Sequence, residues 1–254
     1  MKNKFTNELA VCGIAAVSAL VKKSSNKIRR FYYTDERKKA FSGLFKELAS
    51  RKVPYNMVES EELEKLSGTV HHQGVVAMIE QPEIPPLTTD ITDEWLHTHQ
   101  SALLLDRVGN ANNLGAIVRS AAFFGFKNII IPLDEAQSSI TTSSYRVAQG
   151  GMEYVNVYSI KSITKLLTSM KGKMKRFGTA VDAKTPVSDI EKLSDKKPVL
   201  IILGNEEHGI SREVKENCDE LIIIPFGGEE QEIESLNVAQ AASIVLYECR
   251  KLTV

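Results

Sequence analysis

Six short aliphatic segments, separated by stretches with the composition of helices, occupy the chain after Ser101. They read "ALLLD", "NIIIP", "YVNVY", "RFGTAV", "VLIILG" and "ELIIIPF". Strands that are apolar without alternation are expected in a parallel sheet that helices cover on both faces. The sequence therefore predicts an α/β domain over residues 101–254, and ligands on such a sheet bind at the carboxyl ends of its strands.

A second, smaller α/β domain is predicted for residues 1–80. Hydrophobic periodicity predicts a helix over Cys12–Lys22, a strand over Ile28–Tyr33 and a helix over Lys38–Arg51, and "GVVAMIE" predicts a closing strand. Residues 81–100 hold three prolines within "QPEIPPL" and then a polar stretch, which is typical of a linker.

The charge of the chain is distributed unevenly, although its formal net charge is +0. Residues 1–52 carry thirteen Lys and Arg against four Asp and Glu, so the rest of the chain has an acidic excess. A basic N-terminal part suits a polyanion such as RNA, and a solvated basic face is the alternative. A second basic run, Lys161–Arg176, contains six Lys and Arg and no acid, and we interpret it as an exposed helix face.

The N-terminus has the outline of a secretory signal peptide, because basic "MKNK" precedes the apolar run 9–21. However, Glu8 abuts the run, no clear small-residue cleavage site follows it, and it is too short to span a bilayer. We therefore expect a cytoplasmic protein without a membrane partner. Its three isolated cysteines fit a reducing compartment and form neither a disulfide framework nor a zinc spacing, so no metal is expected.

The first unusual strand end is "GNANNLGAIVRSA", residues 109–121. Its glycines permit a tight turn, and its asparagines can cap the following helix or bind a ligand. The spacing GxGxxG is absent, which argues against a nucleotide-binding enzyme with Rossmann chemistry. Arg119 stands within an apolar helical pattern, where it either extends along the surface to solvent or has a function.

Two further strand ends are unusual. In "LGNEEHGISREV" the glycines Gly204 and Gly209 bracket a polar loop, which either wraps a ligand or is a structural turn, and Ser211 can cap the next helix. In "IPFGGEEQEIESLNVAQAA" an acidic loop leads to an amphipathic helix that starts around Ser235. Ser235 can be its N-cap, whereas Asn237 within an apolar first turn is less easily explained by structure alone.

Taken together, "NLGAIVRSA", "LGNEEHG" with "IIIPF", and "SLNVAQAA" resemble the SpoU/TrmH family of RNA 2'-O-ribose methyltransferases. The resemblance covers the whole chain, because "VCGIAAVSALVKK", "IRRFYYTDE" and "HHQGVVAMIE" look like that family's N-terminal RNA substrate-binding domain. It implies a catalytic domain with a trefoil knot, a homodimer, and methyl transfer from S-adenosylmethionine to a ribose 2'-hydroxyl of structured RNA, either rRNA or tRNA.

The resemblance also implies the site residues. S-adenosylmethionine would contact the backbone at Gly204, Ile224 and Leu236. The residues that match the family's polar active-site positions, with the glutamate beside them, are Arg119, Asn113, Ser235, Asn237 and Glu206. A guanidinium seldom gives up its proton, so we favour a clamp on hydroxyl and phosphate over a general base for Arg119. RNA phosphates would bind the basic side chains of Lys22, Lys23, Lys27, Arg29 and Arg30.

The chain departs from the family pattern in two places. Ala111 stands where the family usually has a proline, which would have stiffened the loop. The acidic loop 227–235 is also longer than the usual connection, and its four glutamates would repel phosphates unless they face solvent or a partner. The alternative function is that of an RNA-binding paralogue with the same fold that has lost methylation.

Overall fold

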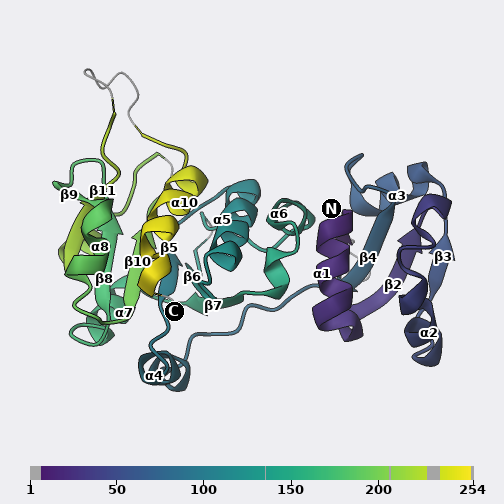
Figure 1. Cartoon of the computed structure of the whole chain (residues 1–254), viewed down its shortest axis with the longest axis horizontal. Helices are drawn as coiled ribbons and strands as arrows, with labels where there is room; N and C mark the ends of the chain where they lie inside the picture. Colours follow the sequence, from purple (N-terminus) through teal and green to yellow (C-terminus); the bar gives the residue numbers. More distant parts are fainter. Residues whose placement is uncertain (1–6, 135, 206, 228–234, 253–254) are drawn as a thin grey trace. The chain divides into compact units, whose positions relative to one another are not determined.

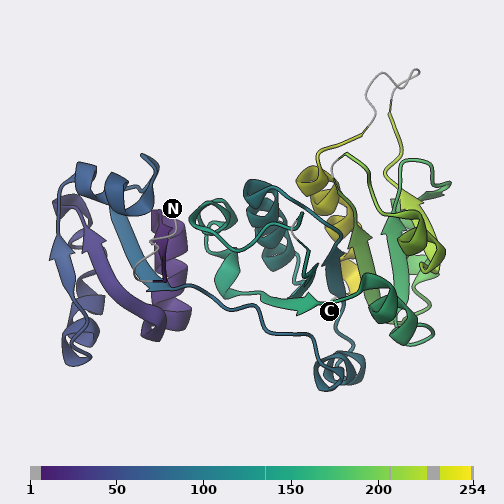
Figure 2. The same cartoon turned by 180° about the vertical axis from the view of Figure 1, so that it is seen from behind.

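The computed structural model describes residues 7–134, 136–205, 207–227 and 235–252. The chain forms two compact units, coloured along the sequence in Figure 1 and seen from behind in Figure 2. The N-terminal unit combines Met1–Glu83 with Ser139–Tyr154, and the C-terminal unit combines Ile84–Ser138 with Val155–Val254.

The N-terminal unit is built on a mixed four-stranded sheet of order β1-β4-β2-β3. Its elements are β1 (Glu8–Cys12), α1 (Ile14–Ser24), β2 (Ile28–Tyr33), α2 (Ser42–Ser50), β3 (Tyr55–Met57), α3 (Ser60–Ser67) and β4 (Val75–Glu80). The helix predicted from Cys12 starts two residues later, because β1 pairs with β4 through Cys12 and Gly13 turns the chain at φ 92°. The strand Ile28–Tyr33 forms with the predicted bounds.

A segment from the middle of the chain completes the N-terminal unit. It contains α6 (Thr142–Ala148) and a 3-10 turn, η3 (Gly151–Glu153). Gly150 lies so close to α1 that an added Cβ would come within 2.7 Å of the Ala19 Cβ. The Gln81 side chain donates a hydrogen bond to the Ile140 carbonyl at 3.0 Å. Residues 139–154 therefore pack with the first 83 residues, although both flanking strands belong to the other unit.

The C-terminal unit contains a seven-stranded sheet of order β7-β6-β5-β10-β8-β11-β9, in which every pair is parallel. The strands are β5 (Ala102–Leu105), β6 (Asn128–Pro132), β7 (Asn156–Ile160), β8 (Lys175–Thr179), β9 (Thr185–Pro186), β10 (Val199–Leu203) and β11 (Glu220–Ile223). The predicted α/β fold with a parallel sheet is confirmed. The segment 81–100 carries one helix, α4 (Thr89–His97).

Helices cover both faces of this sheet, as the uninterrupted aliphatic strands predict. They are α5 (Ala111–Phe123), α7 (Ile163–Ser169), α8 (Ile190–Leu193), α9 (Arg212–Glu216) and α10 (Val238–Cys249). Leu104 packs in one cluster with Trp95 of α4 and Leu167 of α7, whereas its fully buried neighbours Leu103 and Leu105 face the other side. α5 and α10 pack side by side (Figure 1). The path from Gly227 to Ser235, on which the predicted knot depends, lies outside the described residues, so the knot stays a prediction.

A buried ion pair fastens β8 to the start of β11. Arg176, only 3% exposed, donates to the Asp219 carboxylate from Nε at 2.9 Å and from Nη2 at 2.5 Å, and from Nη1 to the Leu167 carbonyl at 2.8 Å. The hydrogen bond from Arg176 holds the pKa of the Asp219 carboxyl below its usual value. The interpretation of Lys161–Arg176 as an exposed helix face is thus wrong: of its six basic residues only Lys165 lies in a helix, α7, and Arg176 lies in β8 and is buried against Asp219.

Replacing Arg176 by Met should destabilise the protein by about 3 kcal/mol at pH 7, because Asp219 would remain partly buried without its partner. Since the pKa of Asp219 is lowered in the folded protein, this contribution is present above its unfolded value of about 3.9 and disappears as the pH falls through the folded pKa. Urea unfolding at pH 7 and at pH 3 measures both effects. Lys215→Met, which breaks the solvent-exposed pair with Asp182, is the control and should cost much less stability.

Candidate functional site

Three loops leave the carboxyl ends of β5, β10 and β11, which parallel pairing brings to one edge of the sheet. β5 lies between β6 and β10 in the sheet, while the chain continues from β5 to β6. The strand order therefore reverses between β5 and β10, and ligands of open α/β sheets bind at such a point. The catalytic and cofactor-binding residues expected from the sequence all follow one of these strands.

The loop after β5 leads directly into α5. Asn110 caps this helix, because its side-chain oxygen accepts a hydrogen bond from the Asn112 amide at 2.8 Å. Ala111 is the first helical residue, and Asn110 before it is extended at φ −92° and ψ 122°. This backbone geometry would also admit the proline that Ala111 replaces, because the residue before proline prefers the extended region.

Asn113 and Asn237 meet, although 124 residues separate them in the sequence. Asn237 Nδ2 donates to Asn113 Oδ1 at 3.2 Å, and Asn237 Oδ1 accepts the Ala239 backbone amide hydrogen at 2.9 Å. Asn237 is thus the N-cap of α10, and the expectation that Ser235 caps this helix is wrong. Ser235 lies two residues earlier and is exposed.

Arg119 is exposed and lies apart from this pair. Each residue of a helix turns about 100°, so Arg119, six residues after Asn113, projects about 120° away around α5. Within the described part of the chain, the Arg119 side chain makes no hydrogen bond or ion pair. It shares a helix face with Phe123, which is 82% exposed. The structure therefore joins Asn113 to Asn237 but not to Arg119, and Glu206 lies outside the described residues.

The turn after β10 explains the glycine at 204. A Cβ there would come within 2.2 Å of the Gly209 carbonyl carbon, because Asn205 and Gly209 exchange two backbone hydrogen bonds at 3.1 and 2.9 Å. Ser211 caps α9, as expected. The turn thus accounts for this glycine without a ligand.

The three positions expected to hold S-adenosylmethionine offer backbone groups and aliphatic surface, and none carries a charge. Gly204 directly follows β10, and Ile224 directly follows β11 and is partly exposed. Leu236, next to the cap of α10, is 49% exposed. Uncharged backbone groups and apolar side chains suit the flat, uncharged adenine of this cofactor, so the residues fit it.

Most of the basic residues expected to bind RNA already have partners within the N-terminal unit. Arg29 pairs with Glu80 at 3.2 Å and Arg30 pairs with Glu8. Lys27 lies 3.6 Å from the buried Glu153 carboxylate, and the Lys23 ammonium lies 5.1 Å from the Tyr154 ring centre. Of the five, only Lys22 has no such contact among the described residues. The sequence could not indicate this pairing, because Glu80 and Glu153 are distant along the chain.

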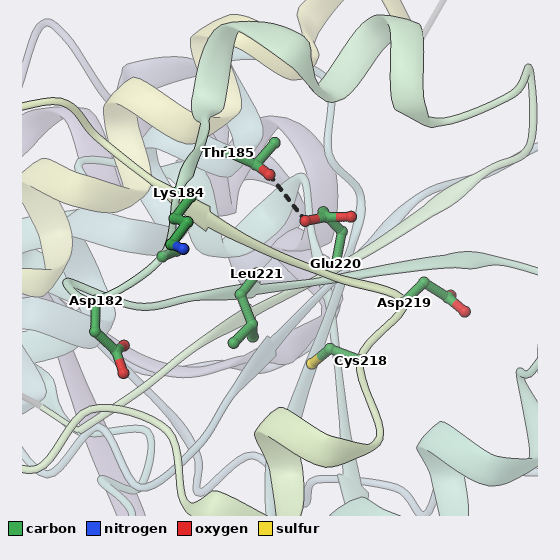
Figure 3. Close-up of a pocket in the computed structure, with 8 residues that line it drawn as sticks. Asp182, Lys184, Thr185, Cys218, Asp219, Glu220 and Leu221 are labelled. Carbon is green, nitrogen blue, oxygen red and sulfur yellow. Dashed lines mark hydrogen bonds between the residues drawn. The ribbon is translucent and has the colours of Figure 1, made fainter.

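The described surface also has a hollow of about 400 Å³ (Figure 3). Its lining runs over Asp182–Thr185 and Cys218–Leu221, where the Thr185 hydroxyl donates to Glu220 at 2.8 Å. None of the predicted site residues lines it. Among the described residues, no cluster of His, Cys, Asp or Glu could hold a metal ion, and no helix is long and apolar enough to cross a membrane.

Comparison with known proteins gives matches over both units. A model described as the SpoU rRNA Methylase family matches residues 100–247, and one described as RNA 2'-O ribose methyltransferase substrate binding matches residues 10–85. The 23S rRNA (guanosine-2'-O-)-methyltransferase RlmB of Acinetobacter baylyi is 36% identical over 196 residues, 75% of this chain and 76% of that protein. RlmB of Coxiella burnetii is 32% identical over 247 residues, 95% of each chain.

Solved structures share the fold. The SpoU methyltransferase AviRb from Streptomyces viridochromogenes, in complex with the cofactor AdoMet, matches with a TM-score of 0.71 at 24% identity, over 96% of this chain and 90% of that chain.

Replacing Ala111 by Pro should raise the free energy of unfolding by about 0.4 to 1 kcal/mol, because the backbone already suits proline at the first helical position. Urea unfolding of the wild-type protein and of Ala111→Pro measures this difference in the free energy of unfolding. Asn112→Pro is the contrasting variant, since it removes the amide that Asn110 caps and should destabilise. A loss of stability in Ala111→Pro would show that the loop does not have this geometry.

Proposed function

The chain belongs to the SpoU rRNA methylase family and is an S-adenosylmethionine-dependent RNA ribose-2'-O-methyltransferase, and we propose that it methylates a guanosine ribose of 23S rRNA. The family match over residues 100–247 carries this proposal, and the matched substrate-binding model over residues 10–85 supports RNA as the substrate. The names of the relatives support the choice of 23S rRNA.

We propose that the active site forms around the paired side chains of Asn113 and Asn237, and that Ser235 and Glu206 contribute to it. Their contact fixes the start of α10 against the start of α5 at the carboxyl edge of the sheet. Gly204, Ile224 and Leu236 would hold S-adenosylmethionine, which supplies a methyl group on a cationic sulfonium. The polar side chains would orient the ribose hydroxyl, since alignment of the reacting atoms contributes strongly to a displacement of this kind.

Arg119 is proposed to act as a clamp on the ribose hydroxyl and the neighbouring phosphate. A guanidinium seldom gives up its proton at neutral pH, whereas its fork of N–H donors suits phosphate oxygens. The exposed position of Arg119 supports this role, because within the described residues no carboxylate competes for it. The proton of the hydroxyl would then leave to solvent or to phosphate.

RNA isolated from a strain that lacks the gene is the substrate for a methyl-transfer assay, and the 2'-O-methyl site is then mapped. This assay tests both the 23S rRNA substrate and the clamp role of Arg119. The wild-type protein should methylate 23S rRNA, Arg119→Lys should keep part of kcat/KM, and Arg119→Met should lose about 100-fold or more. RNA binding measured alongside separates chemistry from affinity. An inactive Arg119→Lys that still folds and binds RNA would contradict the clamp, and a wild-type protein that binds RNA without transfer would favour the non-catalytic paralogue.

RNA contacts are proposed for the basic residues of α1, the 3-10 turn Ser25–Lys27 after it and β2, at Lys22, Lys23, Lys27, Arg29 and Arg30. The pair of Arg29 with Glu80 is exposed on both sides, so phosphate can replace the carboxylate at little cost. Lys22 and Lys23 lie in the last turn of α1 and are exposed. A cytoplasmic location is also proposed, because ribosomal RNA is the substrate and the isolated cysteines agree with a reducing compartment.

We also propose a homodimer that forms through an exposed aromatic face on α5 and α10. This face consists of Phe123, Phe124, Ile244 and Tyr247. The ring centres of Phe123 and Phe124 are 5.0 Å apart, and those of Phe124 and Tyr247 are 6.2 Å apart, so the apolar surface is continuous across both helices. Continuous exposed apolar surface marks interfaces between proteins.

Phe123→Glu should convert the dimer to a monomer, because the carboxylate would lose its water in the interface. Sedimentation velocity should give twice the 28.2 kDa chain mass for the wild type and one chain mass for the variant. Leu133→Glu is the matched control, since Leu133 is another strongly exposed apolar residue outside this face, and it should remain dimeric. A monomeric wild-type protein would refute the proposed interface.

A further inference from the structure

The loop after β5 is held by a glutamine that belongs to none of the family motifs. Gln137 follows the neighbouring strand β6, and its side chain bonds both backbone groups of Val108: Oε1 accepts the Val108 amide hydrogen at 3.0 Å, and Nε2 donates to the Val108 carbonyl at 3.0 Å. The same carbonyl accepts the Ser138 amide hydrogen at 2.9 Å. One side chain therefore takes the place of a strand partner where β5 has ended.

The same loop is held from the opposite side by Asn205, which follows β10. Its Nδ2 donates to the Arg107 carbonyl at 2.9 Å, while its Oδ1 accepts the amide hydrogens of Glu207 and His208 at 2.9 and 3.1 Å. Arg107 has φ +59°, a left-handed conformation that side chains other than glycine disfavour. Two carboxamides thus fix consecutive carbonyl groups at residues 107 and 108 from the two strands that flank β5.

The fit between this loop and the Gln137 segment is also tight. A Cβ at Gly109 would come within 3.1 Å of the Ala136 carbonyl oxygen, so the backbone at 109 lies against the residue before Gln137. Gln137 itself is held by a bond from its amide to the Asp134 carbonyl at 3.0 Å. The backbone of Gln137 is therefore held in place, and its side chain can order the loop by hydrogen bonding to Val108.

We propose that Gln137 is a positioning residue for methyl transfer, which orders the loop that leads into α5, the helix that carries Asn113 and Arg119. This proposal rests on the proposed function of that loop. It also accounts for Ala111: where proline would restrict the backbone covalently, this chain restricts it with side-chain hydrogen bonds to Val108 and Arg107, three and four residues earlier. Gln137 acts through the loop, and a misplacement of catalytic groups by about 1 Å can cost about 100-fold in rate.

The test compares four variants in the full-length protein: Gln137→Met, Ala111→Pro, the two combined, and Asn217→Ala. Gln137→Met keeps the length of the side chain and removes its hydrogen bonds. Asn217→Ala removes a carboxamide that also donates to a backbone carbonyl, that of Glu213 at 2.9 Å, away from the loop. The measurements are kcat and KM for S-adenosylmethionine and for RNA, and hydrogen exchange of residues 107–114.

In Gln137→Met, the backbone amide hydrogens of residues 107–114 should exchange with solvent faster than in the wild type. Its kcat should fall about 10-fold, while the KM for S-adenosylmethionine and the KM for RNA should each change less than about 2-fold. The added Ala111→Pro should slow the exchange again and recover most of the lost kcat, while Asn217→Ala should match the wild type. A stability effect alone would not give this rescue in kcat.

An unchanged kcat in Gln137→Met, or a loss that Ala111→Pro fails to reduce although exchange slows, would overturn the positioning role. The exchange experiment does not need activity. A wild-type protein without transferase activity would therefore refute the proposed function, whereas unchanged hydrogen exchange in Gln137→Met would refute the positioning role of Gln137.

Discussion

Parallel pairing of β5 with β6 and β10 is the constraint on which the rest of this molecule depends. It brings the residues after these three strands to one edge, although Arg107 after β5 and Asn205 after β10 are 98 positions apart in the chain. Parallel strands also end with unpaired backbone groups, which must find partners. Here Gln137 and Asn205 supply partners to residues 107 and 108, so the same edge that collects the polar side chains also needs side-chain hydrogen bonds to be ordered.

Much of this architecture could be predicted from the sequence, because its signals are local. Six aliphatic segments predicted six strands of the parallel sheet, and Ser211 was recognisable as a cap from its own position. The short β9 and the strand β1 were not predicted, because pairing with distant strands defines them. The start of α10 was misplaced for the same reason: Asn237 is oriented by Asn113, a contact that no local pattern contains.

The pairing of charged residues, like the start of α10, depends on contacts between residues that are distant in the sequence. The basic excess of the first 52 residues suggested which side chains could meet phosphates, but a count of charges does not show which of them already have partners. Arg29 and Lys27 lie beside carboxylates that come 51 and 126 residues later, and Arg176, expected at the surface, is buried against Asp219. Only the folded chain distinguishes an available cation from one that stabilises the fold.

The membership of residues 139–154 in the N-terminal unit has a consequence for biosynthesis. The ribosome releases the first 83 residues well before α6 and η3, which pack on β1 and α1. The N-terminal unit therefore cannot finish folding as an independent module during translation; it waits until β5, α5 and β6 have also been made. For the same reason, evolution could not exchange this unit by a single cut and join near residue 83, because the recipient protein would lack the segment that completes it.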